Sequence, residues 1–291
     1  MSRPASEPSR ASFAPRAAAA AIGVIALCFP MVARADEPPH ELRHDLRVDV
    51  PLAIGLVGTA ATLTATEGLF GPSHCRWCDE DDQGNDTLNP LDRSVRDALV
   101  RRDPTFAARV SDIFGLALVP ISMLGLTTLA AVDERSIDKT PVDLLIVAES
   151  VGLATTATQI TKFVAGRQRP YVHALAPDQR DPNDAAKDRY FSFFSGHSSF
   201  TFALATSAGT VSSLRGYRLA PFVWGVGLTL AATTGYLRIA ADKHYFTDVL
   251  TGALVGAACG VTVPLLHGRQ SVAVGAEEVR GGSMLTVGGA F

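Results

Sequence analysis

Three residues that can hold an anion stand together where a polar segment gives way to an apolar one. Ser195, Gly196 and His197 directly precede the apolar run that starts at Phe200. We expect that run to be a helix, and a helix N-terminus presents unpaired backbone N–H groups and the positive end of the helix dipole. The triplet therefore indicates an oxyanion site, although a helix cap beside a surface histidine would use the same residues.

A second candidate group is basic. Lys162 lies near the end of an apolar run, and Arg167 and Arg169 follow just before Pro170. Because proline stops or kinks a helix, we expect these cations to gather at one helix end. Arginine offers phosphate a planar fork and lysine a point charge. The alternative is an anchor at a membrane edge, or a cluster that compensates the helix dipole.

The third group comprises Arg238, His244 and Asp248, with five and three residues between them. If a helix starts near His244, Asp248 lies one turn further along the same face, and its carboxylate can accept a hydrogen bond from one ring nitrogen. The other nitrogen would then be free as a nucleophile or a base. A purely structural His–Asp pair is the alternative.

In chain order the three groups read Lys-x6-Arg-Pro, Ser-Gly-His and Arg-x5-His-x3-Asp, each at a boundary between apolar segments. This pattern resembles the type 2 phosphatidic acid phosphatase (PAP2) superfamily, which also holds bacterial class A acid phosphatases and vanadium haloperoxidases. The resemblance covers residues 142–266. Phe194 and Leu237 depart from the family pattern, which has proline and serine at these positions.

The resemblance implies a role for each motif residue. His244 would attack phosphorus and form a phosphohistidine, Asp248 would orient it, and His197 would protonate the leaving oxygen. The phosphoryl oxygens would be bound by Lys162, Arg169, Ser195, Gly196 and Arg238. Arg167 is left out because the family spacing selects Arg169. No metal or cofactor is implied, and vanadate would act as an inhibitor or as an alternative cofactor.

Residues 1–35 have the pattern of a signal peptide. Arg3, Arg10 and Arg16 precede the apolar residues 17–32, and Ala33-Arg34-Ala35 resembles a cleavage site. An uncleaved membrane anchor is the alternative. In an exported protein, the neighbouring Cys75 and Cys78 favour a local disulfide, and a zinc site that includes His74 is the alternative. Cys259 lies in an apolar run and is expected to be a buried small hydrophobe.

The apolar runs that must position the motifs are long enough for helices. They cover residues 51–69, 114–132, 142–165, 200–214, 220–237 and 249–266, and three of them approach the length of a membrane span. We therefore expect an all-α bundle of about six mostly apolar helices, embedded in a membrane. The mean hydropathy of +0.19 is compatible with this, and the net charge of −3 gives no reason to expect nucleic acid as a partner.

Four parts of the chain are expected. They are the signal peptide 1–35, N-terminal helices with an acidic cysteine-containing loop at 36–141, a PAP2-like phosphatase core at 142–267, and a tail at 268–291. In the tail, Val274, Leu285 and Val287 alternate with small residues, which favours a short β-hairpin. A disordered tail is the alternative.

The expected function is a metal-independent phosphatase of the bacterial cell envelope that acts on phosphatidate or an isoprenyl diphosphate. A soluble-substrate acid phosphatase or a vanadate-dependent haloperoxidase would use the same pocket, and a non-catalytic envelope scaffold is an alternative of another class.

The orientation in the membrane follows from charge. The positive residues Arg135, Lys139, Arg215 and Arg218 flank the helix ends away from the motifs, so the positive-inside tendency places the site and the cysteines in the periplasm. A cleaved signal peptide would leave the start of the mature chain in the periplasm. Six spans with the site in the periplasm instead put the start of the first span in the cytoplasm, so the two predictions conflict. Association with the outer membrane is a further alternative. Substrate identity and oligomeric state are not predicted.

Overall fold

The structure, a computed structural model, describes residues 40–81, 83–175, 188–268, 273–279 and 282–288. The predicted signal peptide lies outside these residues.

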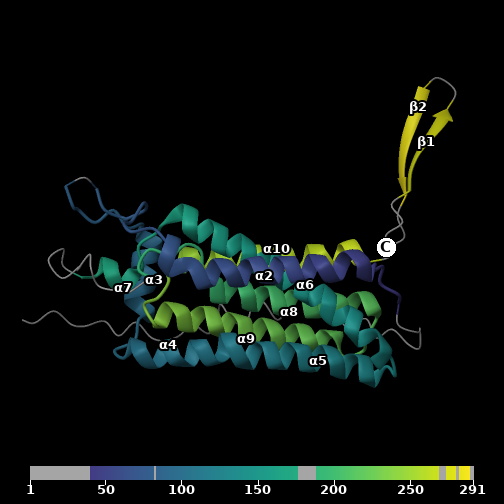
Figure 1. Cartoon of the computed structure of the whole chain (residues 1–291), viewed down its shortest axis with the longest axis horizontal. Coiled ribbons are helices and arrows are strands. Elements are labelled where there is room, and N and C mark those ends of the chain that lie inside the picture. The colour runs from purple at the N-terminus through teal and green to yellow at the C-terminus, as the bar shows by residue number, and fades with distance from the viewer. Residues whose placement is uncertain (1–39, 82, 176–187, 269–272, 280–281, 289–291) are drawn as a thin grey trace, which may run out of the picture. The chain divides into compact units, whose positions relative to one another are not determined.

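The predicted all-α architecture is confirmed. The long helices are α2 (Leu46–Phe70), α4 (Pro104–Ile113) continued by the π-helix η2 (Phe114–Leu118) and α5 (Val119–Asp133), α6 (Thr140–Ala165), α8 (Gly196–Arg215), α9 (Ala220–Ala240) and α10 (Phe246–His267). Shorter elements are α3 (Pro90–Leu99), the 3-10 helix η3 (Ile137–Lys139) and α7 (Pro170–His173). Figure 1 shows the long helices side by side, with α3 and α7 at one end.

The helices run back and forth between the two ends of the bundle, which we call the motif end and the opposite end. The motif end contains the connections 71–103, 166–175, 188–195 and 241–245, which are joined by bonds such as Tyr171 N to the Asp242 carbonyl at 3.2 Å. The opposite end contains residues 40–45, 134–139 and 216–219. There Arg43 N donates to the His267 carbonyl at 2.8 Å and His40 N donates to the Arg215 carbonyl at 3.0 Å. All three motif groups thus come to one end.

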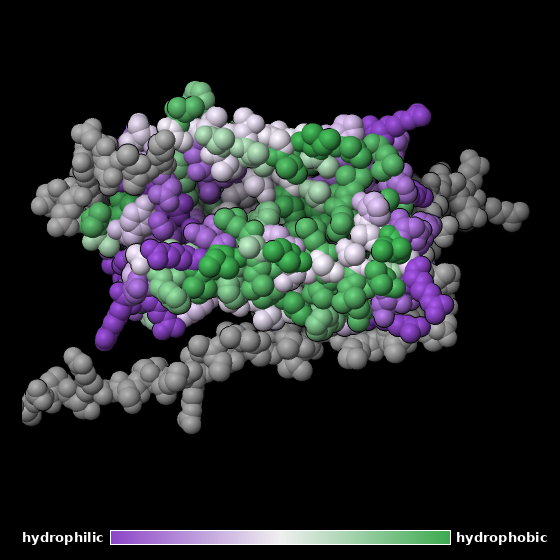
Figure 2. All heavy atoms as spheres, turned by 60° about the horizontal axis from the view of Figure 1, so that its bottom comes forward, coloured by the Kyte–Doolittle hydropathy of each residue, from purple (hydrophilic) through white to green (hydrophobic). Residues whose placement is uncertain are grey.

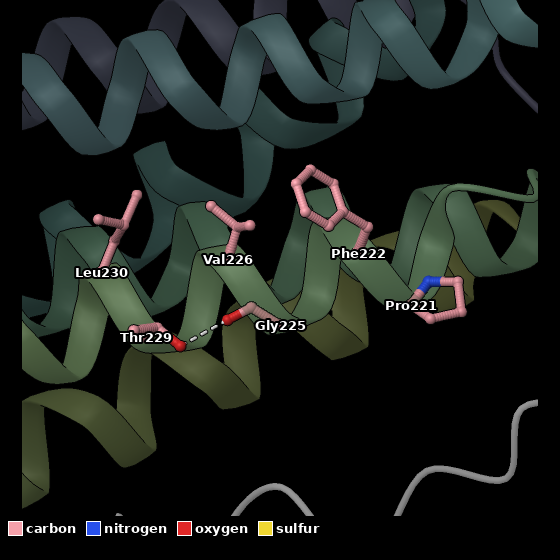
Figure 3. Close-up of a pocket in the computed structure, with 6 residues that line it drawn as sticks. All are labelled: Pro221, Phe222, Gly225, Val226, Thr229 and Leu230. Carbon is pink, nitrogen blue, oxygen red and sulfur yellow. Dashed lines mark hydrogen bonds between the residues drawn. The ribbon is translucent and has the colours of Figure 1, made fainter.

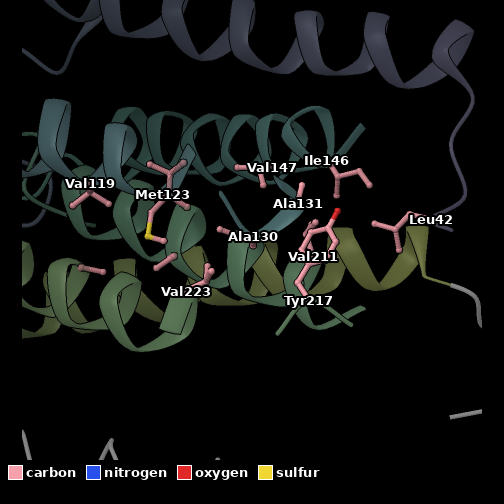
Figure 4. Packing of buried hydrophobic residues seen from close by; sticks show 14 residues of the cluster. Leu42, Val119, Met123, Ala130, Ala131, Ile146, Val147, Val211, Tyr217 and Val223 are labelled. Carbon is pink, nitrogen blue, oxygen red and sulfur yellow. The ribbon is translucent and has the colours of Figure 1, made fainter. Parts of the chain in front are cut away.

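Helix α8 lies at the centre of the packing, with contacts to α10, α9, α6 and α5. Small residues allow α10 to approach it: a Cβ atom on Gly252 would lie 2.5 Å from the Ser195 carbonyl oxygen, and side chains at Gly256 and Gly260 would also collide with α8. A hydrophobic cluster that includes Met123, Val147, Val211 and Val223 fills the space between the helices (Figure 4). Tight packing along α8 fixes its N-terminus, where Ser195 to His197 lie.

Among the described residues, four helical segments are long and apolar enough to cross a membrane: α2, Pro104–Asp133, Ile137–Ala165 and α10. Hydrophobic side chains on them face outward, for example Ile54, Ile121 and Leu254, each more than 60% exposed. Figure 2 shows hydrophobic residues over the middle of the visible face and hydrophilic residues toward its two ends. This pattern is that of a membrane protein.

Three smaller predictions concern the loop, the tail and Cys259. Cys75 and Cys78 form a disulfide, so their sulfurs are not available for the zinc site considered as the alternative. In the tail, β1 (Ala273–Val279) pairs antiparallel with β2 (Gly282–Gly288). Cys259 on α10 is partly exposed rather than fully buried.

Candidate active site

His244 is buried at the motif end, and its hydrogen bonds fix its tautomer. Its Nδ1 lies 2.8 Å from the Ser192 carbonyl, and because a carbonyl only accepts, Nδ1 must carry the proton. The Nε2 atom therefore carries the ring's lone pair, which accepts a hydrogen bond from Arg169 Nη1 at 3.1 Å. A nucleophilic nitrogen thus points at a cation able to hold a phosphoryl oxygen.

The electrostatic surroundings keep this imidazole neutral. Burial lowers the pKa of His244 well below its usual range, and the positive charges of Arg169, Arg238 and Lys162 lower it further. The same charges would attract an anionic group to Nε2. Arg169 is itself held in place, since its Nε donates to the Asp188 carbonyl at 2.7 Å and its Nη1 to the Lys243 carbonyl at 2.8 Å.

Asp248 does not make the predicted hydrogen bond to His244. Its Oδ2 is 3.8 Å from His244 Nδ1 and instead accepts from the Ser192 hydroxyl at 2.6 Å and from Tyr245 N at 3.0 Å. The reason is the start of α10, which begins at Phe246 with Tyr245 as its N-cap, so His244 precedes the helix. Asp248 closes a capping box and reaches His244 only through Ser192.

Arg167, which the motif spacing passed over, is fully buried and organises the support behind the site. Its Nη1 lies 2.6 Å from Asp248 Oδ1, its Nη2 3.0 Å from Asp92 Oδ2 and its Nε 3.1 Å from Asp79 Oδ2. The guanidinium also stacks over a tryptophan and a tyrosine ring, with its carbon 4.2 Å from each ring centroid. Arg167 therefore joins the acidic loop to the N-terminus of α10.

His197, the predicted acid, contacts a residue outside the three motifs. Its Nε2 lies 3.1 Å from Asp112 Oδ1, and the same carboxylate oxygen is 3.0 Å from Arg238 Nη1. Asp112 lies in the last turn of α4, which ends at Ile113 just before the π-helix. Gly115 in that π-helix packs on the imidazole, because a Cβ atom there would lie 2.6 Å from His197 Cδ2. Such π-helical turns are frequent at functional sites.

The remaining predicted phosphate ligands surround the N-terminus of α8. A Cβ atom on Gly196 would lie 3.5 Å from Lys162 Nζ, so the ammonium group stands beside the glycine backbone. Arg238 Nε is buried and has no hydrogen-bond partner within the described residues. Ser195 is the N-cap: its hydroxyl accepts from Ser198 N at 3.4 Å, and its N donates to the Asp248 carbonyl at 3.0 Å. Phosphate binding by the Ser195 hydroxyl stays a prediction.

Sequence reasoning missed the support residues Asp79, Asp92, Asp112, Arg167 and Ser192. Asp79, Asp92 and Asp112 lie upstream of the segment that resembles the family, so no motif selects them. The density of aspartates in residues 79–92 was the available signal. The contacts show that a cation of the chain itself, Arg167, holds this segment through Asp79 and Asp92.

A depression on α9 is separate from this site. Figure 3 shows that one helix supplies its lining, which consists of Pro221, Phe222, Gly225, Val226, Thr229 and Leu230. The only hydrogen bond drawn there runs from the Thr229 hydroxyl to the Gly225 carbonyl at 2.7 Å. None of the six residues is ionisable, so this surface offers apolar contact and no acid–base chemistry.

Comparison with known proteins places the similarity on the part of the chain that carries the motifs. Residues 143–271 match the family model of the PAP2 superfamily, whereas no curated protein matches the chain. One similar solved structure is the first transmembrane PAP2 type phosphatidylglycerolphosphate phosphatase from Bacillus subtilis, with 18% identity, 75% of this chain and 94% of that chain covered, and a TM-score of 0.45. Another is Aquifex aeolicus LpxE, with 23% identity, coverages of 54% and 93%, and a TM-score of 0.32.

Proposed function

We propose that the chain is a membrane phosphatase, and the premise is that residues 143–271 match the family model of the PAP2 superfamily, which the three motifs resemble. Its substrate is a lipid phosphate or diphosphate of the phosphatidate or isoprenyl type, and its intermediate is a phosphohistidine on His244. The observation that supports this most directly is the unprotonated Nε2 of a neutral, buried His244, whose lone pair accepts a hydrogen bond from the Arg169 guanidinium at 3.1 Å.

The first half-reaction transfers the phosphoryl group to the enzyme. Arg169, Arg238 and Lys162 bind the phosphoryl oxygens, and the charge that develops on them is neutralised by these fixed cations. His244 Nε2 attacks phosphorus in line with the leaving oxygen, so that a P–N bond forms while the P–O bond breaks. The proton on His197 Nε2 goes to the leaving oxygen, and the Ser192 carbonyl stabilises the protonated Nδ1 of the charged intermediate.

The second half-reaction returns the enzyme to its starting state. Water attacks phosphorus, His197 takes one of its protons, and the P–N bond breaks to release inorganic phosphate. Support for a lipid substrate comes from the four segments long and apolar enough to cross a membrane, since a helix buried in the bilayer brings the motif end to the depth of lipid head groups. The proposed location is the cell envelope, with the site in the periplasm.

The test is phosphate release by the purified full chain in detergent. We expect release from phosphatidate or isoprenyl diphosphate to exceed release from a soluble phosphomonoester, and His244→Ala to lower kcat by at least about 10³-fold, because it removes the nucleophile. Label from a ³²P-substrate should become bound in an alkali-stable, acid-labile form to the wild type and not to His244→Ala.

The matched control is His74→Ala, which removes an exposed histidine of the acidic loop and should leave the rate unchanged. Retained activity in His244→Ala would contradict the mechanism. A preference for the soluble ester would contradict the lipid substrate, bromide oxidation with peroxide and vanadate would favour the haloperoxidase, and no turnover of any substrate would favour the scaffold.

A further inference from the structure

A second cluster of ionisable residues lies at the opposite end of the helices. Asp49 on α2, Glu149 on α6 and His267 on α10 each direct one ligand atom to a common place, and these atoms all lie within 4.8 Å of one another. Asp49 and Glu149 are buried, with 8% and 2% of their surfaces exposed. We propose that the three residues form a site for one divalent transition-metal ion that clamps α2, α6 and α10 together.

The geometry of His267 is that of a metal ligand. Its Nδ1 lies 2.7 Å from the Arg43 carbonyl, and since a carbonyl only accepts, Nδ1 is the protonated nitrogen. Its Nε2 lies 2.9 Å from Glu149 Oε2. Histidines that bind metals with one nitrogen usually donate the other N–H to a carbonyl or carboxylate, which fixes the ring orientation. In the neutral ring, Nε2 and Oε2 would both be acceptors, so a cation or a further proton must lie between them.

The second observation concerns the carboxylates. Glu149 Oε1 is buried and has no hydrogen-bond partner among the described residues, although Oε2 of the same group faces His267. Asp49 Oδ2 accepts a bond from Asp45 N at 2.7 Å. Within the described part of the chain, neither carboxylate forms an ion pair with a lysine or an arginine. A buried carboxylate without a permanently charged partner is costly, and an ion bound between the two would supply the missing charge.

The donor set selects the class of ion. One imidazole nitrogen and two carboxylates suit Zn²⁺ or Mn²⁺, whereas Ca²⁺ and Mg²⁺ prefer oxygen donors alone. The three residues lie far apart in sequence and on different helices, so a bound ion would stabilise the fold by cross-linking them. The site is away from the PAP2 motifs, and its role is therefore structural rather than catalytic.

The test measures metal content and stability rather than activity. The full chain is purified in detergent, stripped with a chelator and equilibrated with Zn²⁺ or Mn²⁺, and bound metal is counted by mass spectrometry. We expect about one ion per chain in the wild type, with affinity at least about tenfold weaker in Glu149→Gln and in His267→Ala. The added metal should raise the melting temperature of the wild type and not that of the two variants.

Glu149→Gln preserves the size of the side chain and its contact with His267, so it remains informative if His267→Ala fails to fold. His74→Ala, which removes a histidine of the acidic loop, should bind metal as the wild type does. Equal metal binding by the wild type and Glu149→Gln would overturn the proposal. So would the absence of bound metal from the wild type, which would leave a protonated His267 paired with Glu149. Neither result would bear on phosphatase activity, so failure of this proposal is distinguishable from failure of the proposed function.

Discussion

The guanidinium of Arg167 connects the acidic loop to the site without facing the substrate. It bonds to Asp248, which bonds to the Ser192 hydroxyl, and the carbonyl of Ser192 in turn accepts from His244. This chain of contacts sets the tautomer and the direction of the proposed nucleophile. Because the group lies fully buried among three carboxylates, a smaller or uncharged residue would leave charges without partners. Arg167 is thus a positioning residue and not a phosphate ligand.

The pH dependence of activity should report two histidines in opposite protonation states. His244 must be neutral to attack, and since burial and the neighbouring cations lower its pKa well below the usual range, activity should be lost only as pH falls through that low value. His197 must be protonated, so activity should be lost as pH rises through its pKa. Burial lowers the pKa of His197, and the Asp112 carboxylate opposes that effect.

Asp112→Asn should therefore move the alkaline limb of kcat/KM to lower pH by about one unit, because it removes the charge that favours the protonated imidazole. The acid limb should stay in place. The quantity kcat/KM is the one to measure, since it reports ionisations of the free enzyme, in which the contact between Asp112 and His197 exists. Asp138→Asn, at the opposite end, is the control. A profile without an acid limb would argue against His244 as the nucleophile.

The π-helix η2 between α4 and α5 is predicted to position the imidazole of His197. It presents Gly115 to the His197 ring, where a Cβ atom would lie 2.6 Å from Cδ2. Gly115→Ala should push the imidazole away from the leaving oxygen and lower kcat by about 10²-fold, the cost of a misplacement of about 1 Å. Gly125→Ala on the same continuous helix is the matched control, since no atom lies within 4 Å of its Cβ position. Similar loss of kcat in both variants would show that helix packing, and not the contact with His197, is responsible.

Apolar length was sufficient to predict most helices, and the place of the three motif groups at helix boundaries was sufficient to predict that they come to one end. Hydrophobic runs locate a helix because each must bury one face, but they do not mark its first residue. The wrong prediction for His244 came from the start of this helix. Tyr245 is the N-cap of α10, so His244 lies before the helix and not one turn from Asp248 on the same face. Helix α3 was missed because polar residues interrupt its apolar ones and leave no long apolar run. Its contacts, such as Arg96 with Asp242 at 2.7 Å, are known only after folding.

The positions of the two ends bear on how the whole molecule is oriented in the membrane. Residues 40–45 lie at the opposite end, joined to the C-terminus of α10 by the bond from Arg43 N to the His267 carbonyl. The orientation proposed here, with the motif end in the periplasm, therefore places residue 40 in the cytoplasm. Cleavage after Ala35 by a periplasmic peptidase requires the reverse. The two sequence predictions cannot both hold for a protein with six spans.

Protease sites inserted in the connections can separate these cases. A site after Gln83, in the exposed part of the acidic loop, should be cut when protease is added outside intact spheroplasts. A site after Asp138, exposed at the opposite end, should be cut only once the membrane is opened, because the positive residues Arg135, Lys139 and Arg218 favour the cytoplasm. If the site after Asp138 is cut in intact spheroplasts and the site after Gln83 is not, the motif end does not face the periplasm. That result would be compatible with a cleaved signal peptide. Cutting at both sites in intact spheroplasts would place the domain outside the inner membrane, where neither the positive-inside tendency nor the count of spans applies.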